Sequence, residues 1–171
     1  MPPLAYFLTW TCYGTWLHGD DRGSVEDPHN RYARPYLAPN PGWSTAESRL
    51  LKSPPVTLDT AMRRVVRDAA LEHLAFKECT LVALNVRTTH THLVIRSKSC
   101  EPGRLAGSFK AWSTRRLRDA GLLAPDAKVW TARSSTRYLW FEGAVQGARK
   151  YVLDEQGPRD EFAVAGTECL E

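Results

Sequence analysis

The segment that decides the fold is residues 79–97, which read CTLVALNVRTTHTHLVIRS. Two runs rich in Leu, Val and Ile, at 79–86 and 90–97, flank a short polar turn of Arg, Thr and Thr. Such runs are typical of buried strands, and strands this close in sequence predict an antiparallel hairpin.

The second run carries two histidines at a spacing of two residues. Side chains alternate along a strand, so His90, His92 and Val94 are expected on one face and the residues between them on the opposite, helix-covered face. Two neutral imidazoles side by side form half of a metal site. The alternative is a pair of surface histidines at the start of a strand, and the motif alone does not separate the two.

Outward from the hairpin, apolar periodicity and turn residues predict the remaining elements. The resulting order, β-α-β-β-α-β-α, is that of an α+β ferredoxin-like (RRM-like) antiparallel sheet with two helices on one face, an open opposite face, and an added C-terminal helix. The predicted elements are strands at 4–11, 128–132 and 137–141, and helices from Thr57 or Asp59 to about 74, from Pro102 to Gly121, and over 143–156.

Length and composition predict one globular domain. The chain has 171 residues, of which 43% are hydrophobic and 25% charged. We expect this domain to span 1–157, with a Pro-rich irregular insertion at about 20–55 and a mobile tail at 158–171. No stretch approaches the ~20 apolar residues of a membrane helix, and the N-terminus does not read as a secretory signal.

The four cysteines are widely scattered and form no C-x-x-C pair. This pattern disfavours a structural zinc site and favours free thiols in a cytoplasmic protein.

Positive charge is concentrated in the middle of the chain. Residues 58–122 carry 12 Lys and Arg against 6 Asp and Glu, whereas the segments on either side are balanced or acidic. A surplus of this kind indicates a surface that faces a polyanion, although solvated arginines on two amphipathic helices would give the same count.

Tyr151 is the second residue that indicates chemistry. It lies in RKYVLDEQ at 149–156, inside the last predicted helix, with Arg149 and Lys150 before it and Glu155 one turn later. Neighbouring cations would favour a phenolate and hold a phosphate, and the carboxylate could complete a metal site begun by the histidines. The alternative is that Tyr151 has no chemical role and only flanks the buried apolar stripe of this helix.

Taken together, these motifs resemble the single-tyrosine HUH transposases, and within them the REP-associated tyrosine transposases. The resemblance covers about residues 6–156 and rests on His-Thr-His, the basic helix and Tyr-x-x-x-Glu in this order. Further matching stretches are YGTWL at 13–17 with Gly19-Asp20, FKAW at 109–112 with Arg115-Arg116-Leu117, and STRYL at 135–139.

The resemblance implies a metal-dependent single-strand DNA endonuclease and strand transferase. Mg²⁺ or Mn²⁺ would be held by His90, His92 and a third ligand after Tyr151, and would polarise the scissile phosphate. Tyr151 would attack that phosphate and form a 5′-phosphotyrosine, which a 3′-hydroxyl later resolves. Relatives act on hairpins in single-stranded DNA at the bacterial nucleoid, and no organic cofactor or membrane is implied.

Two positions depart from the family pattern. Thr91 stands where a bulky apolar residue is usual, at some expected packing cost. Glu155 stands where relatives commonly have Gln or Asn as the third ligand. A carboxylate suits Mg²⁺, and Gln156 points about 100° further round a helix, so Glu155 is the expected ligand.

DNA contacts are expected from cations and aromatic side chains. Trp10, Tyr13 and Trp16 are candidates for stacking on bases, although Trp10 is expected in the core. The candidate phosphate contacts are Lys98, Arg104, Lys110, Arg115, Arg116, Arg133, Arg137 and Lys150.

Two other functions deserve comparison. The first is a domesticated module that binds DNA or RNA without cutting: the intact His90, His92 and Tyr151 speak against it, whereas Thr91 and Glu155 leave it open. A histidine-triad hydrolase would need a third histidine at Val94, and a two-histidine phosphoesterase would need a second His-x-Thr/Ser motif. Relatives include both monomers and swapped dimers, and we expect a monomer from the branch that the sequence resembles.

Overall fold

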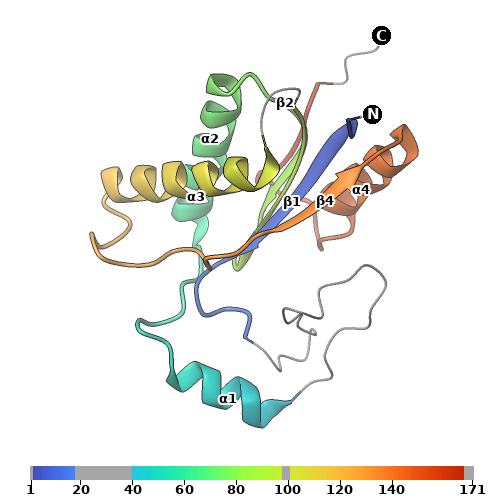
Figure 1. Ribbon diagram of the computed structural model, residues 1–171. Coiled ribbons are helices and arrows are strands. Elements are labelled where there is room, and N and C mark those ends of the chain that lie inside the picture. Colours follow the sequence, from blue (N-terminus) through green and yellow to red (C-terminus); the bar gives the residue numbers. More distant parts are fainter. Residues whose placement is uncertain (1, 18–39, 98–100, 168–171) are drawn as a thin grey trace.

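The computed structural model describes residues 2–17, 40–97 and 101–167. Its centre is a five-stranded sheet in the order β4-β1-β3-β2-β5, in which every neighbouring pair is antiparallel. Figure 1 shows α2 and α3 on one side of this sheet and α4 on the other. The elements are β1 (Ala5–Thr11), α1 (Pro41–Arg49), α2 (Thr60–Phe76), β2 (Thr80–Val86), β3 (His90–Arg96), α3 (Pro102–Asp119), β4 (Ser135–Leu139), α4 (Glu142–Asp154) and β5 (Ala163–Ala165).

The predicted ferredoxin-like order is confirmed, and so is the hairpin of β2 and β3. Local signals start the two large helices where the sequence places them. The Asp59 side chain accepts a hydrogen bond from the Met62 N–H, and the Glu101 carboxylate accepts from the Gly103 and Arg104 N–H groups before Pro102 begins α3. These caps satisfy N–H groups that have no partner inside the helix.

The main core fills the space between the sheet and the α2–α3 pair. Leu8 and Trp10 of β1 and Leu93 and Ile95 of β3 point into it, as the alternation of side chains predicts. Phe109 of α3 stacks on Trp10 with ring centroids 6.3 Å apart.

The expectation of an open second face was wrong. α4 packs across that face with Val145, Ala148 and Val152, which bury Ala5 of β1 and Val94 of β3 in a second apolar cluster. The apolar stripe of α4 has to be buried somewhere, and this face of the sheet is the apolar surface next to it.

The expectation of a mobile segment directly after α4 was also wrong. β5 pairs with the outer edge of β2 and returns the chain to the sheet. At Gly166 the backbone runs so close to β2 that a Cβ atom would lie 1.8 Å from the Leu81 carbonyl oxygen. Ahead of β5, Asp160 forms an ion pair with Arg63 at 2.6 Å, and the Arg63 guanidinium lies 4.0 Å above the Phe162 ring.

Two further expectations need correction. Part of the Pro-rich insertion is regular, because Asn40 caps and Pro41 begins α1; residues 18–39 lie outside the described part. Residues 128–132 make a single bridge, Cys12 with Trp130, instead of a strand. Across residues 2–17, 40–97 and 101–167, no helix combines the length and apolar character of a membrane span.

Candidate active site

The two histidines lie on β3, the middle strand of the sheet, on the face that α4 covers. Their ring centroids are 4.7 Å apart. His92 is 6% exposed, and both of its ring nitrogens have partners: Nδ1 lies 2.8 Å from Thr9 Oγ1 and Nε2 lies 3.1 Å from Gln156 Oε1. The strand therefore holds this imidazole in one orientation.

Burial keeps His92 neutral. Loss of hydration, together with the neighbouring His90, lowers the pKa of His92 to about 3. A neutral imidazole has a free lone pair, which is the form that binds a metal ion.

The Gln156 amide oxygen can only accept, so its 3.1 Å contact with His92 is a hydrogen bond from Nε2–H, and a lone pair on Nε2 requires the other tautomer of the ring. A hydroxyl can donate or accept, so Thr9 accommodates either tautomer of the ring. When Nδ1–H donates to Thr9 Oγ1, the lone pair lies on Nε2, on the side of Gln156.

Tyr151 lies in the last turns of α4, directly over the histidine strand. Its ring meets that of His92 edge to face at 5.6 Å and that of Phe7 at 5.9 Å. The side chain is 40% exposed. The phenol is thus positioned by two aromatic contacts and is still accessible to a large substrate.

The structure places Gln156, and not Glu155, beside the histidines. α4 ends at Asp154, so the helical spacing on which the choice of Glu155 rests does not extend to residues 155 and 156. Glu155 instead lies 3.8 Å from the ammonium of Lys150. The turn after the helix brings the Gln156 amide oxygen to His92.

Asn85 is a site residue that sequence reasoning missed. It lies opposite His92 in the β2–β3 register and is 1% exposed. Its Nδ2 donates to the Val152 carbonyl oxygen at 2.8 Å, an oxygen of the last helical turn that has no partner within α4. Asn85 therefore fixes the end of the helix next to Tyr151. The sequence carries one signal for this role: Asn85 is a polar residue in a strand whose other residues are typical of a buried strand.

The donor set fits a small divalent cation. His92 Nε2 and Gln156 Oε1 are 3.1 Å apart, close to the ~3 Å between adjacent ligands of an octahedral Mg²⁺ with bonds of about 2.1 Å. No group of three His, Cys, Asp or Glu side chains in the described ranges could hold a metal ion. His90, His92 and Gln156 are the residues that could hold such an ion.

Arg137, one of the predicted phosphate contacts, lies on the face of the sheet that carries this site. It pairs with Phe7 across β1 and β4, and Phe7 contacts both His92 and Tyr151. Paired residues of antiparallel strands point to the same face, so the exposed Arg137 lies on the face of Tyr151.

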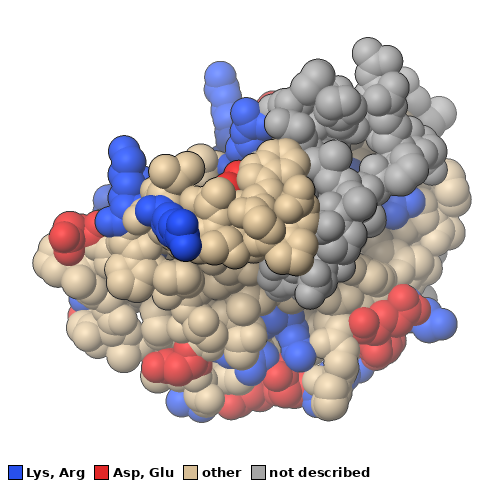
Figure 2. All heavy atoms as spheres, turned by 90° about the horizontal axis from the view of Figure 1, so that it is seen from below, with Lys and Arg blue, Asp and Glu red and all other residues tan. Residues whose placement is uncertain are grey.

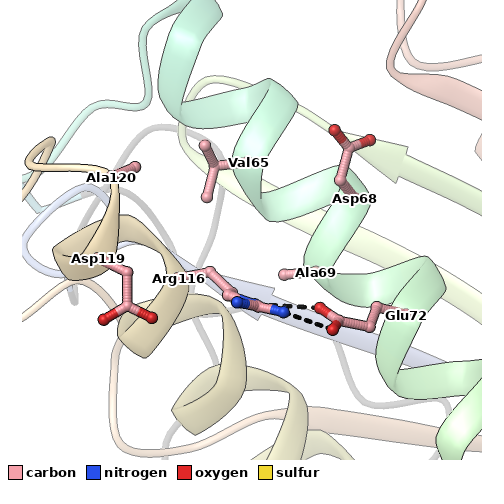
Figure 3. A pocket seen from close by; sticks show the side chains of 7 residues that line it. All are labelled: Val65, Asp68, Ala69, Glu72, Arg116, Asp119 and Ala120. Carbon is pink, nitrogen blue, oxygen red and sulfur yellow. Dashed lines mark hydrogen bonds and ion pairs between the residues drawn. The ribbon is translucent and has the colours of Figure 1, made fainter.

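Lys110 and Arg116 are engaged within the protein. The Lys110 ammonium donates to three carbonyl oxygens, those of residues 131–133, at 2.7 to 3.2 Å, and partial burial lowers its pKa. Arg116 reaches from α3 to Glu72 of α2 and forms a two-pronged ion pair (Figure 3). Both cations hold elements together. Arg104, Arg133 and Lys150 are exposed, and Lys98 lies outside the described residues.

The aromatic residues predicted to stack on bases differ in their exposure. Trp10 is 2% exposed and belongs to the core, as its position on the strand allows. Tyr13 and Trp16 are half-buried at the end of β1. More exposed rings occur elsewhere: Tyr138 and Trp140 are 46% and 54% exposed and stack on each other with centroids 6.2 Å apart.

Comparison with solved structures relates this arrangement to a known fold. A REP-associated tyrosine transposase bound to a REP hairpin superposes with a TM-score of 0.52 at 12% identity, over 91% of this chain and 67% of the other. The two proteins share a fold. A proposed transposase from Deinococcus radiodurans has a TM-score of 0.43 at 18% identity, over 89% of this chain and 90% of the other. No protein-family model matches the sequence, and no curated protein matches it.

Proposed function

We propose that the protein is a transposase-like, metal-dependent endonuclease and strand transferase that acts on single-stranded, hairpin-bearing DNA. The observation that carries this proposal is the convergence of Tyr151, His92 and Gln156 at one end of a sheet whose fold is shared with a REP-associated tyrosine transposase. The hairpin bound to that transposase suggests the same kind of ligand for this chain.

The chain's own residues account for the parts of such a reaction. Phe7 and His92 hold the ring of Tyr151, so the phenol oxygen needs little reorganisation to meet a phosphate. Arg137 lies on the same face as a partner for phosphate oxygens. A bound Mg²⁺ or Mn²⁺ would neutralise charge on the scissile phosphate, and His90, His92 and Gln156 would hold it.

The covalent step balances without a further reactant. The Tyr151 oxygen forms a bond to phosphorus as its phenolic proton leaves to water, and the bond from phosphorus to the 3′-oxygen breaks. The leaving 3′-oxygen takes a proton and becomes a free hydroxyl, while the 5′ end stays on the tyrosine. Attack by a 3′-hydroxyl reverses these changes, joins two strands and restores the phenol.

The course of the chain supports an active site made within one subunit. β4, on one edge of the sheet, leads into α4, and β5 ties the far end of that helix to the opposite edge. Exchange of α4 with a second copy would require β5 to leave the sheet. We infer that Tyr151 serves the histidines of its own chain.

Covalent trapping tests the proposed function. Labelled single-stranded DNA bearing the hairpins that flank the gene is mixed with protein and Mn²⁺, then resolved on a denaturing gel. A labelled adduct is expected with the native protein and is expected to vanish with EDTA, Tyr151→Phe or His90→Ala. Tyr138→Phe is the matched control, because this tyrosine is similarly exposed but sits on the opposite face of the sheet.

Two other outcomes would change the conclusion. DNA that shifts on a native gel without forming any adduct would favour the non-cleaving binding module. Recovery of adduct on mixing Tyr151→Phe with His92→Ala protein would show that the tyrosine acts across subunits.

A further inference from the structure

A groove of about 770 Å³ lies between α3 and the segment 127–132 that leads toward β4. It is separate from the pocket between α2 and α3, which the Arg116–Glu72 ion pair spans (Figure 3). The helix α3, which forms one wall of the groove, lies on the opposite side of the sheet from α4, the helix that carries Tyr151 (Figure 1). Nothing in the proposed chemistry uses the groove.

The floor of the groove is open because α3 presents small side chains there. Gly107, Ala111 and Thr114 follow one another at helical spacing along this wall. A Cβ atom at Gly107 would meet no other atom within 4 Å. From Gly107 to Arg118 the helix runs about 16 Å, enough for an extended polymer to lie along it.

The cations of the groove carry no acidic partner. Arg115, Arg118 and Lys128 line it, and no ion pair joins any of the three to a carboxylate within the described part of the chain. Asp119 is the acidic side chain in the lining. Arg116, between the first two in sequence, is by contrast neutralised by Glu72.

Figure 2 views the molecule from the end on which the connection from α3 to β4 lies. Lys and Arg side chains project at several places on this face, with Asp and Glu side chains among them. Groups of unpaired cations attract phosphates, and Arg in particular pairs with phosphate oxygens through two hydrogen bonds.

The groove is connected to the catalytic end of the sheet. Thr131, on its wall, donates its backbone N–H to the Thr11 carbonyl, and Thr11 is the cross-strand partner of His90. Tyr13, two residues further along, lines the groove with Lys128 5.7 Å above its ring. A strand that passes the end of β1 can therefore run from the histidines into the groove.

We propose that this groove holds the phosphodiester backbone of single-stranded DNA next to the point of cleavage. The inference rests on the proposed function and adds a binding track to it. Arg115, Arg118 and Lys128 contact phosphates, and Tyr13 offers a ring at the entrance on which a base stacks. The contacts read the backbone, so they contribute affinity that depends on salt and not on sequence.

The test measures binding without cleavage. The full-length Tyr151→Phe protein is titrated in EDTA into a fluorescent single-stranded oligonucleotide, at a series of salt concentrations, and anisotropy gives Kd. On this background, Arg115→Gln, Arg118→Gln and Lys128→Gln are combined. The control combines Arg64→Gln, Lys77→Gln and Arg159→Gln, which removes the same charge from sites outside the groove.

The groove variant is expected to bind at least tenfold more weakly at low salt. Its log–log salt slope should fall by about 2, because each lost contact to a single strand removes about 0.7. The control should keep the slope of the parent. Gly107→Leu, which fills the floor without altering charge, is expected to weaken binding as well. None of the variants should lower the melting temperature, and Gly107→Leu should raise it slightly, because leucine is a better helix former than glycine.

Equal salt slopes for the groove variant and the parent would overturn the proposal that this groove binds DNA. The proposed function would survive that result if the native protein still formed the tyrosine adduct. A parent that does not bind single-stranded DNA at any salt concentration would overturn both proposals together.

Discussion

The amide oxygen of Gln156 lies 3.1 Å from Nε2 of His92, although 64 residues separate the two in sequence. The contact exists because α4 ends at Asp154 and the chain then turns back toward the sheet. It joins α4, which carries the proposed nucleophile Tyr151, to the histidine strand at the point of the proposed metal site. Which residue lies in the position of the proposed third ligand depends on this helix end.

Gln156→Ala is therefore expected to weaken Mn²⁺ binding by 10- to 100-fold or more, the range seen when even outer partners of a metal site are lost. Isothermal titration calorimetry on the DNA-free protein measures this directly. Glu155→Gln, which removes only the exposed pair with Lys150, should leave Mn²⁺ affinity within about twofold. If Glu155→Gln reduces the Mn²⁺ affinity more than Gln156→Ala does, Glu155 and not Gln156 is the metal ligand.

Thr91→Val is expected to stabilise the protein. Thr91 is fully buried, and its hydroxyl has no hydrogen-bond partner in the structure. Valine keeps the shape and removes the unsatisfied group, which is worth about 1 kcal/mol or more in the free energy of unfolding. Urea denaturation measures the change. Thr91→Ser, which keeps the hydroxyl and loses the methyl group, should destabilise, and a loss of stability with valine would show that the hydroxyl is in fact satisfied.

Gly166→Ala is expected to destabilise by about 1–3 kcal/mol, the usual cost of overpacking, because the new methyl group meets the Leu81 carbonyl of β2. Thermal denaturation gives the shift in Tm. Gly147→Ala is the control: its Cβ meets nothing within 4 Å, and alanine favours the interior of α4. If both substitutions stabilise, β5 does not pair with β2 as closely as described.

His73 is expected to make stability depend on pH. The His73 side chain packs against α3: Nε2 lies 2.7 Å from Ser108 Oγ, and the ring meets Phe109 edge to face. This burial and the nearby Lys77 lower the pKa of His73, while the charge of Glu72 raises it by a smaller amount. The unfolded chain then binds a proton more readily than the folded one. The contribution of neutral His73 to the free energy of unfolding is fully present above the unfolded pKa of about 6.5. It decreases as the pH falls toward the lower pKa of His73 in the folded protein.

The loss attributable to His73 can be at most about 1.4 kcal/mol per pH unit. It is measured as the difference in urea stability between pH 7 and pH 5, for the native protein and for His73→Gln. The variant should be less stable at pH 7 but should lose less on acidification. Identical pH dependence of the two proteins would show that His73 is protonated equally in both states.

The parts of the fold that the sequence predicts are those that local patterns determine. Three features depend on near neighbours and are confirmed: the hairpin at 79–97, the helix-start residues Asp59 and Pro102, and the alternation around His92. Side chains of β3 face the sides that the period of two requires.

The features that the sequence does not predict are those that depend on contacts between residues far apart in the chain. The three residues of β5 have no pattern of their own and form a strand only because the edge of β2 is free to pair with them. The choice between residues 155 and 156 depends on where α4 ends, and helix ends are the least predictable feature of a pattern. Arg115 and Arg116 look alike in sequence, and only the position of Glu72 on α2 separates an available cation from an occupied one.

The histidine strand and the last turn of α4 are each held in place, but by different contacts. The histidine strand has two strands on each side, so its amides exchange with solvent only when most of the domain unfolds. Tyr151 lies near the end of a helix that the side chain of Asn85 ties down at its last turn. In the proposed reaction, a DNA end attached to Tyr151 would have to move away and return, and any opening of the last turn of α4 would break the Asn85 hydrogen bond and uncover the buried Val152 and Leu153.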